Sequence, residues 1–376
     1  KKGESRFEKA LLLAPREKTV LKQLGGLLLR MEKSDKAGEL LKKAHRFYPE
    51  EGEFCGLLAE AFARLGKEEK AGEYYQKAIK YQPEEEKYYL GLINISRGGK
   101  KFYLKALRSR PGDSQVALKM GELLGRKKLY SAQVEVYEEL VKSEPGNSGF
   151  RALLGESLYA QGRLKEAKKE FLRVLEAERE NVGVLNRLGE IAVRSGALEE
   201  GEKYYQKALS YSPARKKVLL NLGELYLKKG NLKKALKIFQ RAFEYYPEDA
   251  VFSGKLGLSY LKLKDYHKAA EHYKEAIKKA RGLEKKDYYL GLGDVYFAEK
   301  NYSRAEKAYQ KAVEIDPGDI ESILKLAELY GHNKAFSRAE KLYRGVLKKH
   351  PKNLKVREIL AEVLYSQGRM EEAERE

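Results

Sequence analysis

The hydrophobic pattern of this chain repeats with a period of 34 residues. In each period the apolar positions follow helical spacing and form two segments. A small residue marks the first segment, as at Gly223, and alanines such as Ala235 and Ala242 mark the second, with an aromatic residue, here Phe239, between them. Small residues at fixed places let two helices approach closely, and the aromatic ring fills the space beside that contact. The pattern therefore predicts a series of packed helix pairs.

Proline closes the second segment of most periods, because it can neither donate a backbone N–H nor continue a helix. Glycine-containing pairs such as Gly162-Arg163 and Gly230-Asn231 are expected to form the turn between the two helices of a unit. At two of the positions where the 34-residue spacing would place a proline, Arg179 and near Arg281, there is none. The nine prolines follow the 34-residue grid with two local irregularities: Pro15, Pro49, Pro83, Pro111, Pro145, Pro213, Pro247, Pro317 and Pro351.

These positions resemble the tetratricopeptide repeat family over essentially the whole chain. The family pattern is a 34-residue helix pair with small residues at the eighth, twentieth and twenty-seventh places and proline at the thirty-second, and most units here meet it. The resemblance implies an all-α, right-handed superhelical solenoid whose concave groove is lined mainly by the first helix of each unit. We expect one solenoid over residues 1–376, with a half repeat at 1–17, about ten repeats starting near 18, 52, 86, 114, 148, 182, 216, 250, 286 and 320, and a truncated repeat over 354–376.

The unit over 86–113 is shortened to 28 residues. Its segment YYLGLINIS, Tyr88–Ser96, predicts a first helix, but six residues of the following turn and second helix are missing at Arg97–Lys100. Two interpretations account for the short unit. One is a tolerated deletion or missing residues, and the other is a kink or hinge. Two extra residues around Arg281–Lys286 predict a lengthened turn. Because neither end has the polar capping helix that solenoids usually need, we expect a fragment of a longer chain.

The composition provides for a large core and excludes several classes of site. Apolar residues make up 42% of the 376 residues, while Cys55 alone allows no disulfide framework and, with five scattered histidines, no Cys/His zinc cluster. No run approaches the ~18 apolar residues of a membrane helix. We therefore expect a soluble protein of the cytoplasm or the periplasm. The compartment is open, because the chain begins with Lys1 and a targeting segment can have been removed.

The net charge of +20 favours acidic partners, nucleic acid or an anionic membrane surface. The basic residues are spread along the chain in pairs such as Lys233-Lys234 and Lys348-Lys349, which is typical of a solubilising outer surface. A basic convex surface that binds nucleic acid or anionic membrane is therefore the alternative function.

No catalytic motif is present: there is no glycine-rich phosphate loop, no GxSxG and no HExxH. His267 and His272 are five residues apart and would not share a helix face, and Cys55 lies at a core position. At least one tyrosine of each pair, as in Tyr204-Tyr205, lies on the buried stripe, which favours packing over base stacking. The sequence predicts a non-catalytic protein without metal or cofactor.

The ninth place of the first helices, which faces the groove in the resembled family, is acidic in eight of eleven units. Neighbouring first helices pack roughly 10 Å apart, so these carboxylates should form a ladder along the groove. The remaining ninth places are Gly26, Asn94 and Leu258. We call the following set the acidic row: Glu60, Glu122, Glu156, Glu190, Glu224, Asp294, Glu328 and Glu362.

Two interpretations of the acidic row remain open. One is a self-paired, solvated ladder, since i,i+4 ion pairs of ~0.2–0.5 kcal/mol each can form within single helices. The other is a partner site, for which Glu156, Asp294, Glu328 and Glu362 are the better candidates because they lack a basic residue at that spacing. The possible i,i+4 pairs are Glu60–Arg64, Glu122–Arg126, Glu190–Arg194 and Glu224–Lys228.

Apolar residues accompany the acidic row at the fifth and twelfth places. Apolar patches beside carboxylates suit a partner helix or extended segment that carries Lys or Arg and hydrophobic anchors. A known mode of the resembled family, in which Lys and Asn clamp an acidic C-terminus, is disfavoured because the corresponding places here are acidic. We therefore expect a scaffold that binds a protein or peptide in the groove, with self-association through the ends as a further possibility. Bacterial members of the resembled family often serve multiprotein assemblies in envelope assembly, secretion or motility. The apolar candidates are Leu118, Leu220, Leu290 and Leu324 at fifth places and Tyr159, Leu227, Leu261, Phe297 and Tyr365 at twelfth places.

Overall fold

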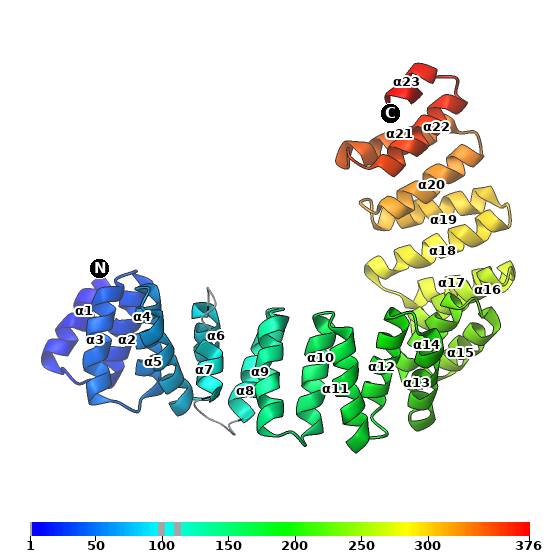
Figure 1. The fold of residues 1–376 in the computed structure, drawn as a ribbon. Helices are drawn as coiled ribbons and strands as arrows, with labels where there is room; N and C mark the ends of the chain where they lie inside the picture. Colours follow the sequence, from blue (N-terminus) through cyan, green and yellow to red (C-terminus); the bar gives the residue numbers. More distant parts are fainter. Residues whose placement is uncertain (1, 97–101, 109–113) are drawn as a thin grey trace. The chain divides into compact units, whose positions relative to one another are not determined.

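The computed structural model describes residues 2–96, 102–108 and 114–376 (Figure 1). Within these residues every regular element is helical and no strand forms. The prediction of an all-α fold built from paired helices is confirmed. The chain divides into two compact units, Lys1–Arg179 and Glu180–Glu376. No described helix has the length and apolar character that crossing a membrane requires.

The first unit contains eleven helices within its described residues. Each packs against the next along the chain, and first helices also contact one another across repeats, as α2 with α4 and α6 with α8. The helices are α1 (Lys2–Leu13), α2 (Lys18–Arg30), α3 (Ser34–Phe47), α4 (Gly52–Arg64), α5 (Glu68–Tyr81), α6 (Glu86–Ile95), α7 (Phe102–Arg108), α8 (Ser114–Arg126), α9 (Tyr130–Ser143), α10 (Ser148–Ala160) and α11 (Leu164–Ala177).

The second unit continues the same order, and its first helices α16, α18 and α20 again contact one another in succession. The two extra residues predicted around Arg281–Lys286 lie at a one-turn 3-10 helix, η1 (Gly282–Glu284). The α-helices are α12 (Val182–Arg194), α13 (Leu198–Tyr211), α14 (Lys216–Lys228), α15 (Leu232–Tyr245), α16 (Ala250–Lys262), α17 (Tyr266–Lys279), α18 (Lys285–Ala298), α19 (Tyr302–Ile315), α20 (Ile320–His332), α21 (Phe336–Lys349), α22 (Leu354–Ser366) and α23 (Met370–Arg375).

The shortened unit is described only in part. Its first helix α6 ends at Ile95, and its second, α7, has seven residues. The turn at Arg97–Lys100, where the sequence indicates missing residues or a hinge, lies outside the described residues. Both interpretations stay predictions.

In several helix pairs, an aromatic ring of the second helix packs directly on a glycine of the first. Phe239 of α15 is fully buried, and a Cβ placed on Gly223 of α14 would lie 2.3 Å from its ring. The same arrangement joins Gly189 to the ring of Tyr205. The glycine removes the side chain that would otherwise separate the two helices, which is the role that the sequence pattern predicts.

The matched substitutions Gly223→Ala and Gly26→Ala should change stability in opposite directions. Alanine at Gly223 would collide with a buried ring, and overpacking should outweigh its better helix propensity, for a net loss of about 1 kcal/mol. A Cβ at Gly26 meets nothing within 4 Å, so Gly26→Ala should gain about 1 kcal/mol. Urea unfolding followed by circular dichroism measures both. A stabilised Gly223→Ala protein would contradict the packing argument.

The segment Tyr-Gln-Lys-Ala, which occurs at 205–208 and again at 309–312, also joins one unit to the next. Gln206 of α13 donates to the Tyr226 hydroxyl at 3.2 Å, and that hydroxyl donates to Glu202 Oε1 at 2.9 Å. Gln310 and Tyr330 repeat the first contact at 3.2 Å. Since Tyr226 and Tyr330 each lie on the following first helix, these bonds fix the register between neighbouring units.

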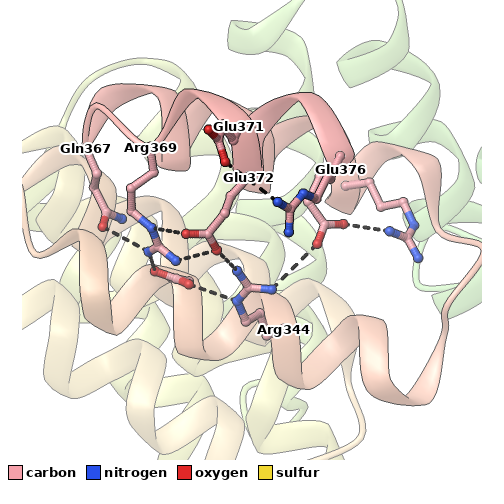
Figure 2. Close-up of polar contacts among 9 residues, drawn as sticks. Arg344, Gln367, Arg369, Glu371, Glu372 and Glu376 are labelled. Atoms are coloured by element: carbon pink, nitrogen blue, oxygen red, sulfur yellow. Dashed lines mark hydrogen bonds and ion pairs between the residues drawn. The ribbon is translucent and has the colours of Figure 1, made fainter.

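The short helix α23 is held by charged groups rather than by apolar burial, since none of its residues is buried (Figure 2). Arg369 pairs with Glu340 and Glu372, each at 2.6 Å, and Arg344 lies 3.2 Å from Glu372. Arg344 also reaches Glu376, at 3.6 Å. Single exposed ion pairs contribute little, but a shared network fixes several side chains at once.

Candidate partner-binding face

The acidic row lies on first helices of both units, as the repeat pattern predicts. Its side chains fall into two classes of exposure, and each unit is considered by itself. Glu122, Glu224, Glu328 and Glu362 are exposed, whereas Glu60, Glu156, Glu190 and Asp294 are half-buried.

In the first unit a hollow of about 630 Å³ brings together Leu118 and Glu122 of α8. Leu153 of α10 lines it as well. Lys119, at its edge, donates to Glu86 at 3.0 Å, and Arg126 lies 2.8 Å from the same carboxylate. The hydrogen bonds from these two cations lower the pKa of Glu86. The hollow therefore presents an apolar wall beside charges of both signs, and sequence reasoning did not single out Glu86 or Lys119.

The other acidic residues of this unit differ in their surroundings. Glu60 accepts from Arg64 at 2.6 Å, which confirms the i,i+4 pair predicted for α4. Glu122 lies 3.9 Å from Arg126, so this second predicted pair forms at the limit of ion-pair distance. Glu156 and Tyr159 are half-buried on α10.

In the second unit, Glu190 belongs to a polar network between α12 and α14. Its carboxylate accepts from Arg187 at 2.7 Å, Lys217 at 3.0 Å, Asn186 at 2.8 Å and Asn221 at 3.1 Å. Burial alone would raise the pKa of Glu190, but the bonds and charges of Arg187 and Lys217 outweigh it and lower that pKa to about 2. Glu190 is therefore a structural anion whose side chain is only 14% exposed.

Two further acids pair with a lysine on the next first helix. Glu224 lies 2.7 Å from Lys255, and Asp294 lies 3.2 Å from Lys325. The i,i+4 spacing predicts a partner only within one helix, which for Glu224 is Lys228. A lysine 31 residues after each acid was the signal that could have revealed both pairs.

Two buried tyrosines show that Asp294, Glu328 and Glu362 follow one another along the same face. The Tyr309 hydroxyl donates to Asp294 Oδ1 at 2.7 Å. Burial raises the pKa of Tyr309, and the charges of Asp294 and Glu328 raise it further. Burial raises the pKa of Tyr343 to about 12, with Glu328 and Glu362 adding to the effect. Each tyrosine thus lies within electrostatic reach of two successive carboxylates of the row.

We call Glu328 and Glu362 the open carboxylates. Both side chains are exposed, and neither has a basic group within 4.0 Å in the part of the chain that the structure describes. Leu324 is half-buried one turn before Glu328, and Tyr365, three residues after Glu362, is 63% exposed. The two helices therefore present paired acidic and apolar side chains.

The other apolar candidates differ in accessibility. Leu290 is 8% exposed and belongs to the core, and Leu220 is half-buried. Phe297 is half-buried, and its ring makes edge contacts with Tyr302 and His332 at centroid distances of 5.7 and 5.4 Å. Leu118, Leu220 and Leu324 are thus half-buried apolar candidates, and each lies one turn before an exposed carboxylate.

The described residues contain no group of three side chains able to hold a metal ion. Cys55 is buried, and burial raises the pKa of its thiol to about 11. His272 stacks on Tyr260 with a centroid distance of 5.4 Å, whereas His267 lies on the exposed side near Glu271. These three residues serve packing or solvation.

Paired helices joined through small residues, aromatic rings and closing prolines define a helical repeat protein. Models of the tetratricopeptide repeat match residues 152–216 and 255–320, residues 192–256 and 332–376, and residues 52–85. The chain belongs to the tetratricopeptide repeat family. Proteins of this family are protein-interaction scaffolds and are generally non-catalytic.

Solved structures resemble this chain at low sequence identity. The C-terminal part of a TPR repeat-containing protein from Cytophaga hutchinsonii is 19% identical, with a TM-score of 0.51, and the match covers 63% of this chain and 96% of that one. The APC/C hetero-tetramer Cut9–Hcn1 gives 14% identity and a TM-score of 0.48, and the match covers 96% of this chain and 92% of that one. YrrB, described as a TPR protein with an unusual peptide-binding site, is 18% identical, with a TM-score of 0.43. The match covers 50% of this chain and 97% of YrrB. A search of curated proteins gave no match.

Proposed function

We propose that the first-helix face of this chain binds a segment of a partner protein that carries Lys or Arg together with apolar anchors. The observation that carries the proposal is the pair of open carboxylates, Glu328 and Glu362, exposed in a protein of net charge +20. A basic residue of a partner would gain a charge-assisted contact there without displacing an existing ion pair. Leu324 and Tyr365 would receive the apolar anchors.

The paired members of the row would support this contact indirectly. Asp294, held by Tyr309 and Lys325, keeps the neighbouring α18 and α20 in register. Leu118 and Glu122, at the hollow of the first unit, would form a separate contact of the same chemistry. The pathway rests on the family expectation alone: a multiprotein assembly of the bacterial envelope, secretion or motility apparatus.

The proposal is tested with a fluorescein-labelled amphipathic peptide of about four helical turns, with Leu on one face and Lys elsewhere. Double reversal, Glu328→Lys with Glu362→Lys, should weaken its binding about tenfold or more, because both contacts become repulsive. The matched control, Glu244→Lys with Glu299→Lys, changes net charge equally at exposed acids outside the acidic row, and binding should change less than about twofold.

Fluorescence anisotropy at low and moderate salt gives both affinities, and circular dichroism checks folding. Equal losses in the two double variants would mean that only net charge matters, and the site would be rejected. An unchanged affinity in the Glu328 and Glu362 variant would reject it as well.

A further inference from the structure

A second concave surface lies on another side of α20 from Glu328, the open carboxylate on that helix. It is a cleft of about 430 Å³ between α20 and α21, with Ile323 and Leu326 on one wall and Leu342 and Val346 on the other. Successive residues of a helix are 100° apart, so Leu326 lies about 160° around the axis from Glu328. The cleft is therefore separate from the proposed partner-binding face.

The cleft has a cause in the sequence of this unit. In the preceding pair, α18 and α19, the eighth and twenty-seventh places are Gly293 and Ala312, whereas α20 and α21 have Ala327 and Val346. Both larger residues are almost fully buried between the helices, with 0% and 2% exposure. Larger side chains at the contact keep the axes further apart, and this leaves the apolar walls partly uncovered.

Gly345 in α21 is a second, independent feature that leaves the cleft open. It lines the cleft, and a Cβ placed on it would meet nothing within 4 Å. Glycine in a helix interior is destabilising, and no packing contact requires one here. Its effect is to leave one wall of the cleft without a side chain.

The rim of the cleft is basic, and no acidic residue lines it. Lys341 and Lys349 are exposed and have no ion pair in the described part of the chain, and His350 lies beside them. Arg338 lies 5.6 Å from the centroid of the Tyr330 ring and 3.6 Å from Glu306. The lining of α21 runs from Arg338 to Lys349, roughly 16 Å or three helical turns.

We propose that this cleft binds an acidic amphipathic helix of a partner protein. The apolar face of that helix would lie between α20 and α21, and its carboxylates would face Arg338, Lys341 and Lys349. The length of the lining favours a helix over a small ligand, and the net charge of +20 disfavours a second copy of this chain. This site is independent of the proposed groove function and takes a ligand of opposite charge.

The test uses a fluorescein-labelled peptide of about three helical turns, with Leu on one face and Glu elsewhere, and a scrambled peptide of the same composition. Gly345→Trp fills the cleft, and Lys341→Glu with Lys349→Glu reverses its rim. Each should weaken binding about tenfold or more. The control Lys233→Glu with Lys237→Glu, at exposed positions of α15, should change it less than about twofold.

The Glu328→Lys, Glu362→Lys variant should retain the acidic peptide, so that failure here and failure of the groove proposal are distinguishable. The cleft proposal is overturned if the scrambled peptide binds equally, or if both cleft variants bind as the unmodified chain does. It is also overturned if phosphatidylglycerol vesicles, or a second copy detected by light scattering, show the dependence on Gly345 and Lys341 in place of the peptide. If Gly345→Trp fails to fold, binding by the Lys341→Glu, Lys349→Glu variant alone tests the cleft proposal.

Discussion

Truncating Phe239 to alanine should lower the free energy of unfolding by about 3–5 kcal/mol. The ring is fully buried and lies against the bare backbone at Gly223, which has no side chain to fill the space that the ring leaves. Loss of the ring removes both its transfer free energy and the contact that joins α14 to α15. Urea unfolding followed by circular dichroism measures the change.

Tyr245 on the same helix provides the control. Its side chain is 46% exposed, so Tyr245→Ala should cost less than about 1 kcal/mol. If the two truncations cost the same, the ring and glycine contact would not be what holds the helix pair together.

Acid should destabilise the second unit through Glu190, with a loss of about 2 kcal/mol between pH 6 and pH 3. The folded-state pKa of Glu190 is about 2, below the usual value of 4.5. A lowered pKa stabilises the fold above the unfolded-state value, and that contribution is lost as the pH falls from about 4.5 toward 2. The loss stays below the full linkage value because the interval ends at pH 3, above the folded-state pKa.

Glu190→Gln removes the titrating group, so the variant should be less stable at pH 6 and lose less on acidification. Unfolding free energies of both proteins at several pH values test this, with Glu244→Gln as an exposed control. Parallel pH profiles for the wild type and Glu190→Gln would show that the network with Lys217 and Asn221 contributes nothing to the pH dependence.

The fold follows from the sequence because its rule is local and repeated. Gly223 and Phe239 occur at places that recur every 34 residues, and each occurrence supports the same helix contact. Repetition therefore identifies the core positions. Most tyrosines recur at those positions, so they are expected to pack in the core rather than to bind a partner. The first helices carry the acidic row for the same reason.

The pairing of the acidic row could not be predicted in the same way. Lys255 and Lys325 reach Glu224 and Asp294 across neighbouring helices, and that contact depends on how two units stack. The burial of Leu290 likewise depends on neighbours outside its own helix. The cleft beside Val346 follows from side-chain volumes at two positions, which a pattern of small residues describes only coarsely.

The position of Tyr343 near Glu328 and Glu362 couples the ionisation of its hydroxyl to the charge on both carboxylates. The chain has no tryptophan, so tyrosine dominates its near-ultraviolet signal. The hydroxyl of Tyr343 resists ionisation because of burial and the two negative charges near it. An arginine placed on those carboxylates would stay charged in that pH range and offset part of that resistance, so Tyr343 would ionise at lower pH. Because the chain has 27 tyrosines, the difference in absorbance between the wild type and Tyr343→Phe would be needed to isolate this hydroxyl.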